Sequence, residues 1–397
     1  MQTAGSEVVI VGAARTAIGS FGGSLRHHTA CELAAKVAQA ACERAGVLPD
    51  DVDQIVVGNV LHTEARDMYL ARVAGIDAGM SEHSAALTLN RLCGSGLQAI
   101  VSAANAIALG DAQIAIGAGA ETMSRALFAS PNIRWGARMG EAQIVDMMSG
   151  ALTDPFGAGH MGMTAELVAQ KFDISRERQD AFAVESHRRA IAAIDAGRFD
   201  SQIVPISLET RDGRVLFDKD EHPRRNVSVS ALAGMAPAFL REGGTVTAAN
   251  ASGINDGAAA CLLMSLDVAR SVGIRPLARI VSYAVAGVTP ALMGTGPIPA
   301  VRQALSRAKL TLADIDVIEC NEAFSAQALA VAQRLGLEPE RTNPNGGAIA
   351  LGHPLGASGA ILTVKCLYEL QRIDGAMGLI TLCIGGGQGI AMVIERL

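Results

Sequence analysis

Short apolar runs rich in β-branched residues alternate along the chain with alanine-rich stretches of helical length, of which residues 97–109 and 360–370 are the clearest. The apolar runs predict buried strands at residues 8–11, 55–57, 114–116, 280–281, 317–318 and 379–382. This alternation predicts an α/β protein in which helices cover sheets. A last apolar run, residues 390–394, follows a glycine-rich turn and predicts the second arm of a hairpin.

Segments of the first third of the chain recur near its C-terminus. The sequence DVDQI at residues 51–55 is echoed by DIDVI at residues 314–318, and Ser95 is echoed by Ser358. The two offsets, 316 − 53 and 358 − 95, are both 263. A constant offset between distant landmarks predicts two similar halves.

The region between the halves has a different texture. Ser175 predicts the N-cap of a helix that ends at Gly197, and residues 209–226 are charged and turn-rich. Insertions of this size on a rigid scaffold often carry substrate specificity. We therefore predict four segments: an N-terminal half at 1–122, completed by about 245–274, an inserted loop domain at 123–244, and a C-terminal half at 275–397.

Composition narrows the classes of function. A formal net charge of −6 over 397 residues offers no basic field for nucleic acid or acidic membranes. The first ten residues lack the features of a signal peptide, and no apolar run reaches the roughly 18 residues of a membrane span. The seven cysteines are widely spaced without C-x-x-C, which argues against disulfides and zinc and predicts a reducing cytoplasm.

Cys93 lies in the segment NRLCGSG, where a predicted strand gives way to the helix that follows. A sulfur at such a junction has unpaired backbone N–H groups and the positive end of a helix dipole beside it, and both favour the thiolate. Gly94 and Gly96 leave room for a substrate to approach the backbone. Taken alone, a buried cysteine in a glycine turn explains the segment equally well.

His353 precedes the helix of the second half, nearly where Cys93 precedes that of the first. If the halves pack with pseudo-two-fold symmetry, the two residues face each other as nucleophile and base. An isolated loop histidine bonded to a backbone carbonyl is the alternative. Cys383 ends a strand before Gly385, where a thiol can exchange protons and N–H groups can stabilise an oxyanion. The G-x-G at 117–119 lacks the third glycine of a dinucleotide fingerprint, so we reject that reading.

Six motifs occur in the order found in the thiolase family: NRLCGSGLQA, HMGMTAE, NASGINDGAA, NEAF, NGGAIALGHPLGASGA and CIGGGQGIA. The likeness runs from Arg15 to the C-terminus. The chain most resembles bacterial acetoacetyl-CoA thiolases and broader-chain β-ketothiolases, the latter favoured by RDMYLARV and RWGARMG. The resemblance implies a duplicated α/β fold in αβαβα layers with an inserted loop domain, a homo-oligomer (tetramer or dimer), and CoA and acyl-CoA as ligands with no metal or other cofactor.

The resemblance also implies roles for single residues. Cys93 is the acylated nucleophile, His353 activates it and helps to form an oxyanion hole, and Cys383 moves the proton of the acetyl-CoA α-carbon. Asn321 holds a catalytic water, and the N–H groups of Cys93 and Gly385 form a second oxyanion hole. The positions that match the family's CoA-binding and acyl-binding residues are His160, Met161, Arg224 and Ser252 for CoA and Met293 and Phe324 for the acyl group.

The implied function is the reversible condensation of two acetyl-CoA to acetoacetyl-CoA and CoA, with thiolytic cleavage of short-chain 3-ketoacyl-CoA through acyl-Cys93. Three alternatives stay open: a longer-chain thiolase of β-oxidation, a ketoacyl synthase-like condensing enzyme, and a non-catalytic binder of CoA or lipid. Cys383 argues against the synthase, which typically uses two histidines. The sequence does not fix the physiological direction of the reaction. It allows cleavage in the degradation of fatty acids and condensation that supplies polyhydroxyalkanoate biosynthesis. Cys320 adds a third thiol before Asn321, and we interpret it as packing.

Overall fold

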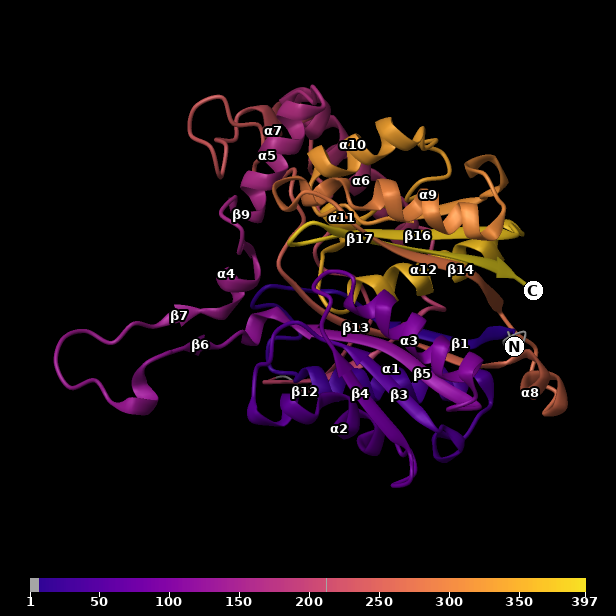
Figure 1. The fold of residues 1–397 in the computed structure, drawn as a ribbon. Coiled ribbons are helices and arrows are strands. Elements are labelled where there is room, and N and C mark those ends of the chain that lie inside the picture. The colour runs from indigo at the N-terminus through magenta and orange to yellow at the C-terminus, as the bar shows by residue number, and fades with distance from the viewer. Residues whose placement is uncertain (1–6, 212) are drawn as a thin grey trace.

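The computed structural model describes residues 7–211 and 213–397. The first six residues of the predicted N-terminal half lie outside the described residues. They include part of the ten-residue segment that was judged to lack the features of a signal peptide. One sheet runs through both halves in the order β15-β16-β17-β14-β1-β13-β5-β3-β4 (Figure 1). Its strands are β1 (Val8–Thr16), β3 (Gln54–Gly58), β4 (Ala85–Leu89), β5 (Ile114–Thr122), β13 (Asn255–Ser265), β14 (Ala278–Gly287), β15 (Val317–Cys320), β16 (Met377–Ile384) and β17 (Gln388–Arg396), with β2 (Gly19–Ser20) and β10 (Ile203–Val204) paired at its side. Every strand predicted from an apolar run is confirmed, and β16 and β17 form the predicted hairpin.

The helices arrange this sheet into layers (Figure 1). The outer face of the N-terminal half is covered by α1 (Ala30–Ala45) and α2 (Leu70–Asp77), and that of the C-terminal half by α9 (Pro297–Ala308) and α10 (Ser325–Leu335). Between the two halves lie α3 (Ser95–Leu109) and α12 (Ser358–Ile373). The predicted αβαβα layering is therefore confirmed. By length and composition alone residues 92–109 would pass as a membrane span, but 61% of that window is buried inside the molecule as this core helix.

The two central helices are the equivalent elements of the repeat, because they begin at Ser95 and Ser358, 263 residues apart (358 − 95). They cross near their N-termini at two glycines. A Cβ added to Gly96 would lie 2.8 Å from the Ala360 nitrogen, and one added to Gly359 would lie 2.3 Å from the Leu97 nitrogen. Backbone thus meets backbone, which brings the loops before the two helices together.

The glycines at 117–119 serve the same packing. They lie inside β5, not in a turn, which agrees with rejecting a dinucleotide fingerprint. A Cβ on Gly117 would lie 2.5 Å from the Ile100 Cα, and one on Gly119 would lie 2.4 Å from the Gly356 carbonyl oxygen. Strand β5 therefore lets α3 and the loop before α12 approach the sheet closely.

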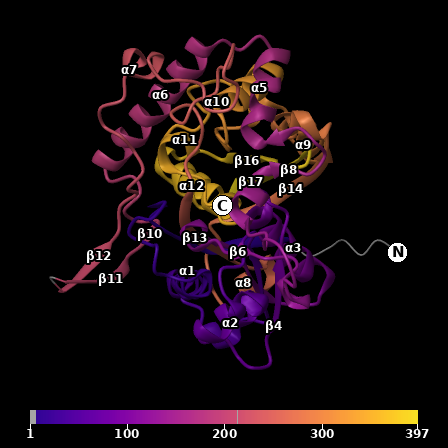
Figure 2. The same ribbon diagram turned by 90° about the vertical axis from the view of Figure 1, so that its left-hand side faces the viewer.

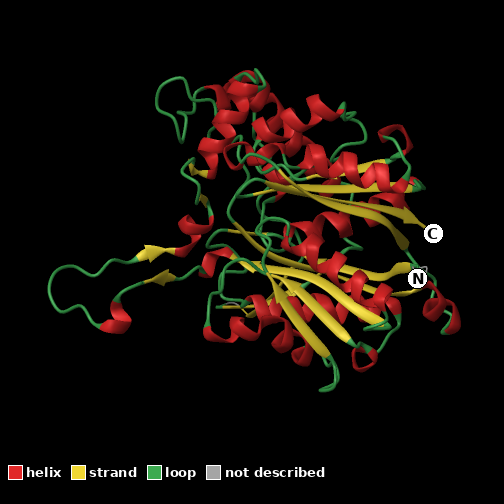
Figure 3. Cartoon of the chain, viewed as in Figure 1, coloured by secondary structure: helices red, strands yellow, loops and turns green. Residues whose placement is uncertain are grey.

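The region between the halves combines long loops with helices. Figure 2 looks at it face on, and Figure 3 shows a mostly irregular arm, residues 126–146, that reaches away from the body. The whole region between the halves contains β6 (Phe128–Ala129), β7 (Val145–Asp146), α4 (Met147–Ala151), β8 (Thr153–Asp154), β9 (Gly159–His160), α5 (Met161–Lys171), α6 (Arg176–Asp195), β11 (Ile206–Thr210), β12 (Gly213–Phe217) and α7 (Val229–Ala233). Two short helices elsewhere are α8 (Leu266–Ser271) and α11 (Ala348–Leu351). The segment 255–265 does pair with β1 and β5, but the borders of the inserted domain stay a prediction.

Helix α6 begins as predicted, with the Ser175 side chain accepting a hydrogen bond from the Arg178 N–H. Its buried face is partly polar. Val184 is only half-buried, whereas Ser186 and His187 are buried. These polar groups are satisfied by hydrogen bonds to segments that reach the site described next.

Candidate active site

Cys93 lies at the strand-to-helix junction that the sequence predicts. The chain leaves β4, turns through Leu92 in the left-handed region (φ +47°) and enters α3 at Ser95. The Ser95 hydroxyl holds this turn, because it accepts from the Arg91 N–H at 2.8 Å and donates to the Leu92 carbonyl at 2.7 Å. A non-glycine residue in this conformation costs about 1–3 kcal/mol and persists where its surroundings enforce it. The turn thus fixes the thiol at the start of the helix.

The surroundings of the Cys93 thiol only partly match the prediction. The backbone N–H groups of Gly385 and of Cys93 itself point at the sulfur and lower its pKa, as expected. Burial acts more strongly in the other direction, and the pKa rises to about 11. The predicted effect of the N–H groups is therefore present, but burial outweighs it. The thiol is protonated at neutral pH and needs a base.

His353 is fixed in one tautomer. Its Nδ1 lies 2.6 Å from the Ser358 Oγ, and the same hydroxyl donates to the Pro354 carbonyl at 2.8 Å. Because the hydroxyl proton is used there, Oγ must accept, which places the imidazole proton on Nδ1. Nε2 then carries the lone pair, 3.3 Å from the Asn321 Nδ2 donor. Burial lowers the pKa of His353 to about 4, so the ring is a neutral base at neutral pH.

Asn321, whose Nδ2 contacts His353 Nε2, also carries a buried acceptor. The residue is 1% exposed, and its Oδ1 has no hydrogen-bond partner among the described residues. Buried carbonyl oxygens are rarely left unpaired, so this oxygen suits a small donor from outside the chain. The water that Asn321 is predicted to hold would be such a donor.

Two residues that the sequence analysis missed hold the loop of His353. Asn255 accepts from the His353 N–H at 2.9 Å and donates to the Gly19 carbonyl at 3.0 Å. Gly352, at φ +108°, leaves room for that amide, because a Cβ there would lie 2.4 Å from the Asn255 Cγ. The NASGIND motif contained this residue, but nothing in its type signalled a structural amide.

Glu121 is the second missed residue, and it ties the halves together. Its buried carboxyl accepts from Val60 N (3.1 Å), Leu61 N (3.0 Å) and Gly356 N (2.7 Å), and from the Asn59 side chain at 3.1 Å. Asn59, Val60 and Leu61 belong to the nucleophile half, and Gly356 belongs to the loop of His353. Burial raises the pKa of Glu121 to about 7, against its backbone partners. A charged residue at the end of a glycine-rich strand was the available signal.

The segment around Asn321 is anchored in the same way. Asn343 accepts from the Cys320 N–H at 2.9 Å and donates to the Cys320 carbonyl at 2.8 Å and to the Glu322 carboxylate at 2.8 Å. Glu322 also accepts from the Ser186 hydroxyl of α6 at 2.6 Å. The Cys320 thiol packs among apolar side chains of the outer layer, in agreement with its interpretation as packing.

Cys383 ends β16 inside a small apolar cluster. It is 1% exposed and shares this cluster with Met161, Met293 and Phe324. Burial raises its pKa well above the ordinary value, and the neighbouring thiols of Cys93 and Cys320 act in the same direction. The structure therefore brings three of the predicted binding residues to Cys383, and Cys383 to Cys93.

His160 lies at the edge of this cluster. It caps α5, with Nδ1 accepting from the Gly162 N–H at 3.1 Å, and burial lowers its pKa. Its ring stacks on Phe239 with centroids 4.8 Å apart, and Phe239 meets Phe324 edge-on at 6.5 Å. Through this aromatic contact His160 joins the wall of the predicted acyl pocket.

Ser252 lies beside the segment that follows Asn321, whereas Arg224 lines a pocket that includes none of the catalytic groups. The Ser252 N–H donates to the Ala323 carbonyl at 3.0 Å. Arg224 lines a separate pocket of about 370 Å³ whose walls include His187, His222 and Ile349. Over residues 7–211 and 213–397, no hydrogen bond or ion pair engages the Arg224 guanidinium, whereas the neighbouring Arg225 is bound to Asp195 at 2.5 Å and 2.9 Å.

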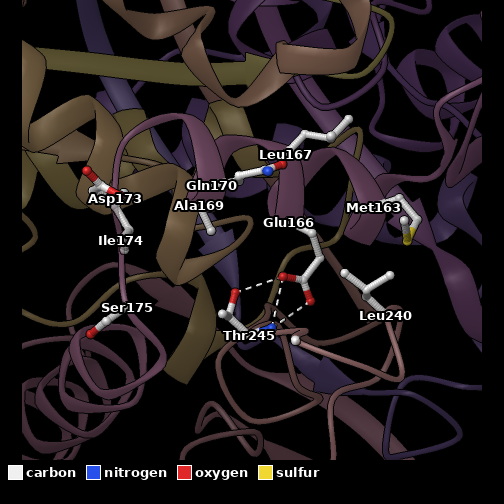
Figure 4. A pocket seen from close by; sticks show the side chains of 11 residues that line it. Met163, Glu166, Leu167, Ala169, Gln170, Asp173, Ile174, Ser175, Leu240 and Thr245 are labelled. Carbon is white, nitrogen blue, oxygen red and sulfur yellow. Dashed lines mark hydrogen bonds between the residues drawn. The ribbon is translucent and has the colours of Figure 1, made fainter.

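A hollow of about 460 Å³ beside α5 contains none of the predicted site residues (Figure 4). One of its carboxylates, Glu166, is already saturated, because it accepts from the Thr245 N–H at 2.9 Å, the Thr245 hydroxyl at 2.8 Å and the Val246 N–H at 2.8 Å. This carboxylate therefore fixes Val246, a member of the apolar cluster around Cys383. In the described part of the chain no group of three or more histidine, cysteine or acidic residues is arranged to hold a metal ion.

Comparison with known proteins agrees with this arrangement. Residues 8–267 match the family model described as Thiolase, N-terminal domain, and residues 274–396 match Thiolase, C-terminal domain. Beta-ketothiolase BktB of Cupriavidus necator is 58% identical over 391 residues, covering 98% of this chain and 99% of the relative. An acetyl-CoA acetyltransferase of the same organism is 51% identical over 393 residues, covering 98% of this chain and all of the relative. The crystal structure of human mitochondrial 3-ketoacyl-CoA thiolase has a TM-score of 0.97 at 43% identity and covers 99% of both chains. The chain belongs to the thiolase family.

Proposed function

We propose that this acyltransferase condenses two acetyl-CoA molecules and, in reverse, cleaves short-chain 3-ketoacyl-CoA with CoA through an acyl group on Cys93. The main support for this proposal is the fixed tautomer of His353, whose Nε2 lone pair points towards Asn321 and not towards Ser358. A neutral base held this way suits a protonated thiol that must be activated. The names of the relatives, acetyl-CoA acetyltransferase and beta-ketothiolase, support the same reaction.

In thiolysis the Cys93 sulfur attacks the ketone carbon and its proton passes to His353 Nε2. The bond between C2 and C3 then breaks, the acyl group stays on sulfur, and Cys383 donates a proton to the acetyl-CoA carbanion. The CoA thiol next attacks the acyl group while Cys383 takes the proton of that thiol. The bond between the acyl carbon and the Cys93 sulfur then breaks, which releases the shortened acyl-CoA, and His353 returns its proton to Cys93. The N–H groups of Cys93 and Gly385 face the sulfur and suit the oxyanion formed there. Protonated His353 and a water on Asn321 suit the enolate oxygen.

The test is CoA-dependent loss of acetoacetyl-CoA by the wild type and by Cys93→Ser. The wild type should turn over and the variant should be nearly silent. Cys42→Ala is the matched control, because that thiol is buried in α1 on the outer face. Turnover of carrier-protein thioesters but not of CoA thioesters would favour a condensing synthase, and binding without turnover of either would favour a scaffold.

For chain length we propose acetoacetyl-CoA and 3-ketovaleryl-CoA as good substrates and long-chain ketoacyl-CoA as poor ones. The support is the packing of Met161, Met293 and Phe324 around Cys383, each of them buried. These large side chains limit the room for an extended acyl group. The kcat/KM of a series of ketoacyl-CoA esters tests this proposal, and equal values for short and long chains would contradict it.

We also propose a homo-oligomer, a dimer built on the open edge of the sheet and a tetramer built through the arm. Strand β4 ends the sheet and exposes Leu87 at 45%. Unpaired edges of this kind favour pairing with another chain. On the arm, Trp135 is 86% exposed and Met139 98% exposed. Light scattering should give a tetramer for the wild type and a smaller species for Trp135→Asp combined with Met139→Asp, and a monomeric wild type would refute the assembly.

We further propose that the reaction needs CoA thioesters alone, without a metal or redox cofactor, and takes place in the cytoplasm. Catalysis through Cys93 and Cys383 requires reduced thiols, and all seven cysteines are unpaired. Dialysis against a chelator should leave turnover unchanged, and mild oxidation should abolish it reversibly. Loss of turnover that only a metal restores would contradict the proposal.

A further inference from the structure

Two histidines outside the catalytic groups lie against each other beside the pocket of Arg224. His187 comes from α6 and His222 from the charged loop, with ring centroids 6.4 Å apart and planes inclined by 12°. His187 is 5% exposed, and His222 is half-buried. Burial, together with the neighbouring imidazole and Arg224, lowers the pKa of His187 to about 4, and burial lowers that of His222. Both rings are therefore neutral at neutral pH.

Each ring is fixed by the backbone of another segment. His187 Nδ1 accepts from the Arg224 backbone N–H at 3.1 Å, so this nitrogen carries the lone pair. His222 Nδ1 lies 2.9 Å from the Ala350 carbonyl, so this nitrogen carries the proton. The two hydrogen bonds join α6 to the charged loop, and the charged loop to α11.

His222 also lies against the segment that follows Ser252. A Cβ on Gly253 would come within 2.4 Å of the His222 Nε2, so the glycine there gives this ring its place. On its other side, Ala350 lies three residues before His353. One imidazole thus contacts the loop of Arg224, the segment of Ser252 and the helix that leads into the catalytic loop.

Among the residues that the structure describes, the pocket beside these rings carries one available cation. It has a volume of about 370 Å³, and its lining includes both histidines, Arg224 and Arg225. Arg225 is engaged by Asp195, which leaves the exposed guanidinium of Arg224 for a ligand. A guanidinium of this kind binds phosphate oxygens with good geometry. CoA carries its phosphates at the nucleotide end, far from the reacting thioester.

We infer that His187 and His222 are positioning residues for the phosphate-bearing nucleotide end of CoA, because they fix the backbone from which Arg224 reaches its pocket. They take no part in making or breaking bonds at Cys93. The inference rests on the proposed function. It adds that affinity for CoA depends on two part-buried imidazole–backbone hydrogen bonds, whereas turnover of a thioester without the nucleotide does not.

The test compares His187→Leu with His187→Asn. Leucine removes the acceptor, whereas the asparagine Oδ1 can take the place of Nδ1. With acetoacetyl-CoA we expect His187→Leu to raise KM about tenfold at nearly unchanged kcat, as for a lost buried hydrogen bond, and His187→Asn to restore most of it. With acetoacetyl-N-acetylcysteamine, which lacks the nucleotide, both variants should match the wild type. At position 222 we expect the same contrast, with His222→Leu raising KM and His222→Asn restoring most of it, because the asparagine Nδ2 can donate to Ala350.

Two measurements keep the outcome clear. Arg224→Ala should reproduce the rise in KM, and its combination with His187→Leu should add little, because both act on one contact. An equal loss with the full and the truncated thioester would overturn the inference, since that loss reports a general defect. Calorimetric CoA binding is independent of turnover. Unchanged CoA affinity in His187→Leu would overturn the inference, whereas weaker binding in a protein without turnover would support it and refute only the proposed function.

Discussion

Replacing Ser358 by alanine should slow catalysis without weakening substrate binding. The Ser358 hydroxyl is the acceptor that keeps the imidazole proton of His353 on Nδ1, 2.6 Å away. Without it the buried Nδ1–H has no partner, and the ring gains by moving its proton to Nε2. In that tautomer Nε2 faces the Asn321 Nδ2 donor and cannot accept the proton of Cys93.

The size of the effect follows from the burial of the group. A buried donor without a partner costs about 1–3 kcal/mol. If this whole cost falls on the tautomer that acts as base, kcat drops about 5- to 150-fold, since each 1.4 kcal/mol is about tenfold. Because Ser358 touches no predicted CoA contact, KM for acetoacetyl-CoA should stay within about twofold of the wild type.

Thiolysis kinetics and alkylation of Cys93 by iodoacetamide measure the two sides of this argument. Both kcat and the alkylation rate should fall in Ser358→Ala. The matched control is Thr363→Val on the same helix, whose buried hydroxyl donates only to the Gly359 carbonyl at 2.9 Å and should not affect kcat. A Ser358→Ala enzyme with wild-type kcat, or with a raised KM alone, would refute the tautomer argument.

Four further outcomes follow from the structure. Gly359→Ala should lower the free energy of unfolding by about 1–3 kcal/mol through overpacking, whereas Gly150→Ala, with open space around its Cα, should be neutral or stabilising in chemical denaturation. Iodoacetamide alkylation of Cys93 should still rise with pH up to about pH 9, because burial holds its pKa near 11, and a plateau at lower pH would contradict this. Because the pKa of Glu121 is raised, this carboxyl contributes a stability that is complete below its ordinary pKa of 4.5 and is lost as the pH rises through about 7. The free energy of unfolding of Glu121→Gln should therefore depend less on pH between these two values. Phe324→Ala should raise kcat/KM for longer ketoacyl-CoA relative to acetoacetyl-CoA, and an unchanged ratio would exclude this side chain from the pocket wall.

Much of the fold could be predicted because local pattern and long-range repeat agree. The apolar runs at 114–116 and 379–382 lie in strands β5 and β16, which begin 263 residues apart (377 − 114). Both strands are buried on both faces and therefore read as continuous apolar runs. The limits lie where polar packing replaces apolar packing. The cap of helix α6 could be identified from the sequence, but its buried face carries the polar residues Ser186 and His187. These residues are buried there because they form hydrogen bonds with Glu322 and with the backbone of Arg224.

The site was predictable to the extent that chemistry marks a residue. Cys93 and His353 stand out as a thiol and an imidazole in glycine-rich turns. Asn255 and Glu121 do not, because a side chain that satisfies backbone N–H groups has no local signature and depends on which loops the fold brings together. The rise in the pKa of Cys93 was not predictable for a related reason, since burial cannot be read from a turn sequence.

The asymmetry of the two halves explains why one fold yields a nucleophile and a base. By the 263-residue offset, the equivalent of Cys93 in the second half is Gly356 (93 + 263). A Cβ there would lie 2.7 Å from the Glu121 carboxylate and 2.9 Å from the Asn59 Cα, so this position admits no thiol. The second half instead places His353 three residues earlier, where Asn255 and Ser358 hold it. Glu121 therefore has two effects: it binds the halves together, and it reserves the nucleophile position for the first half alone.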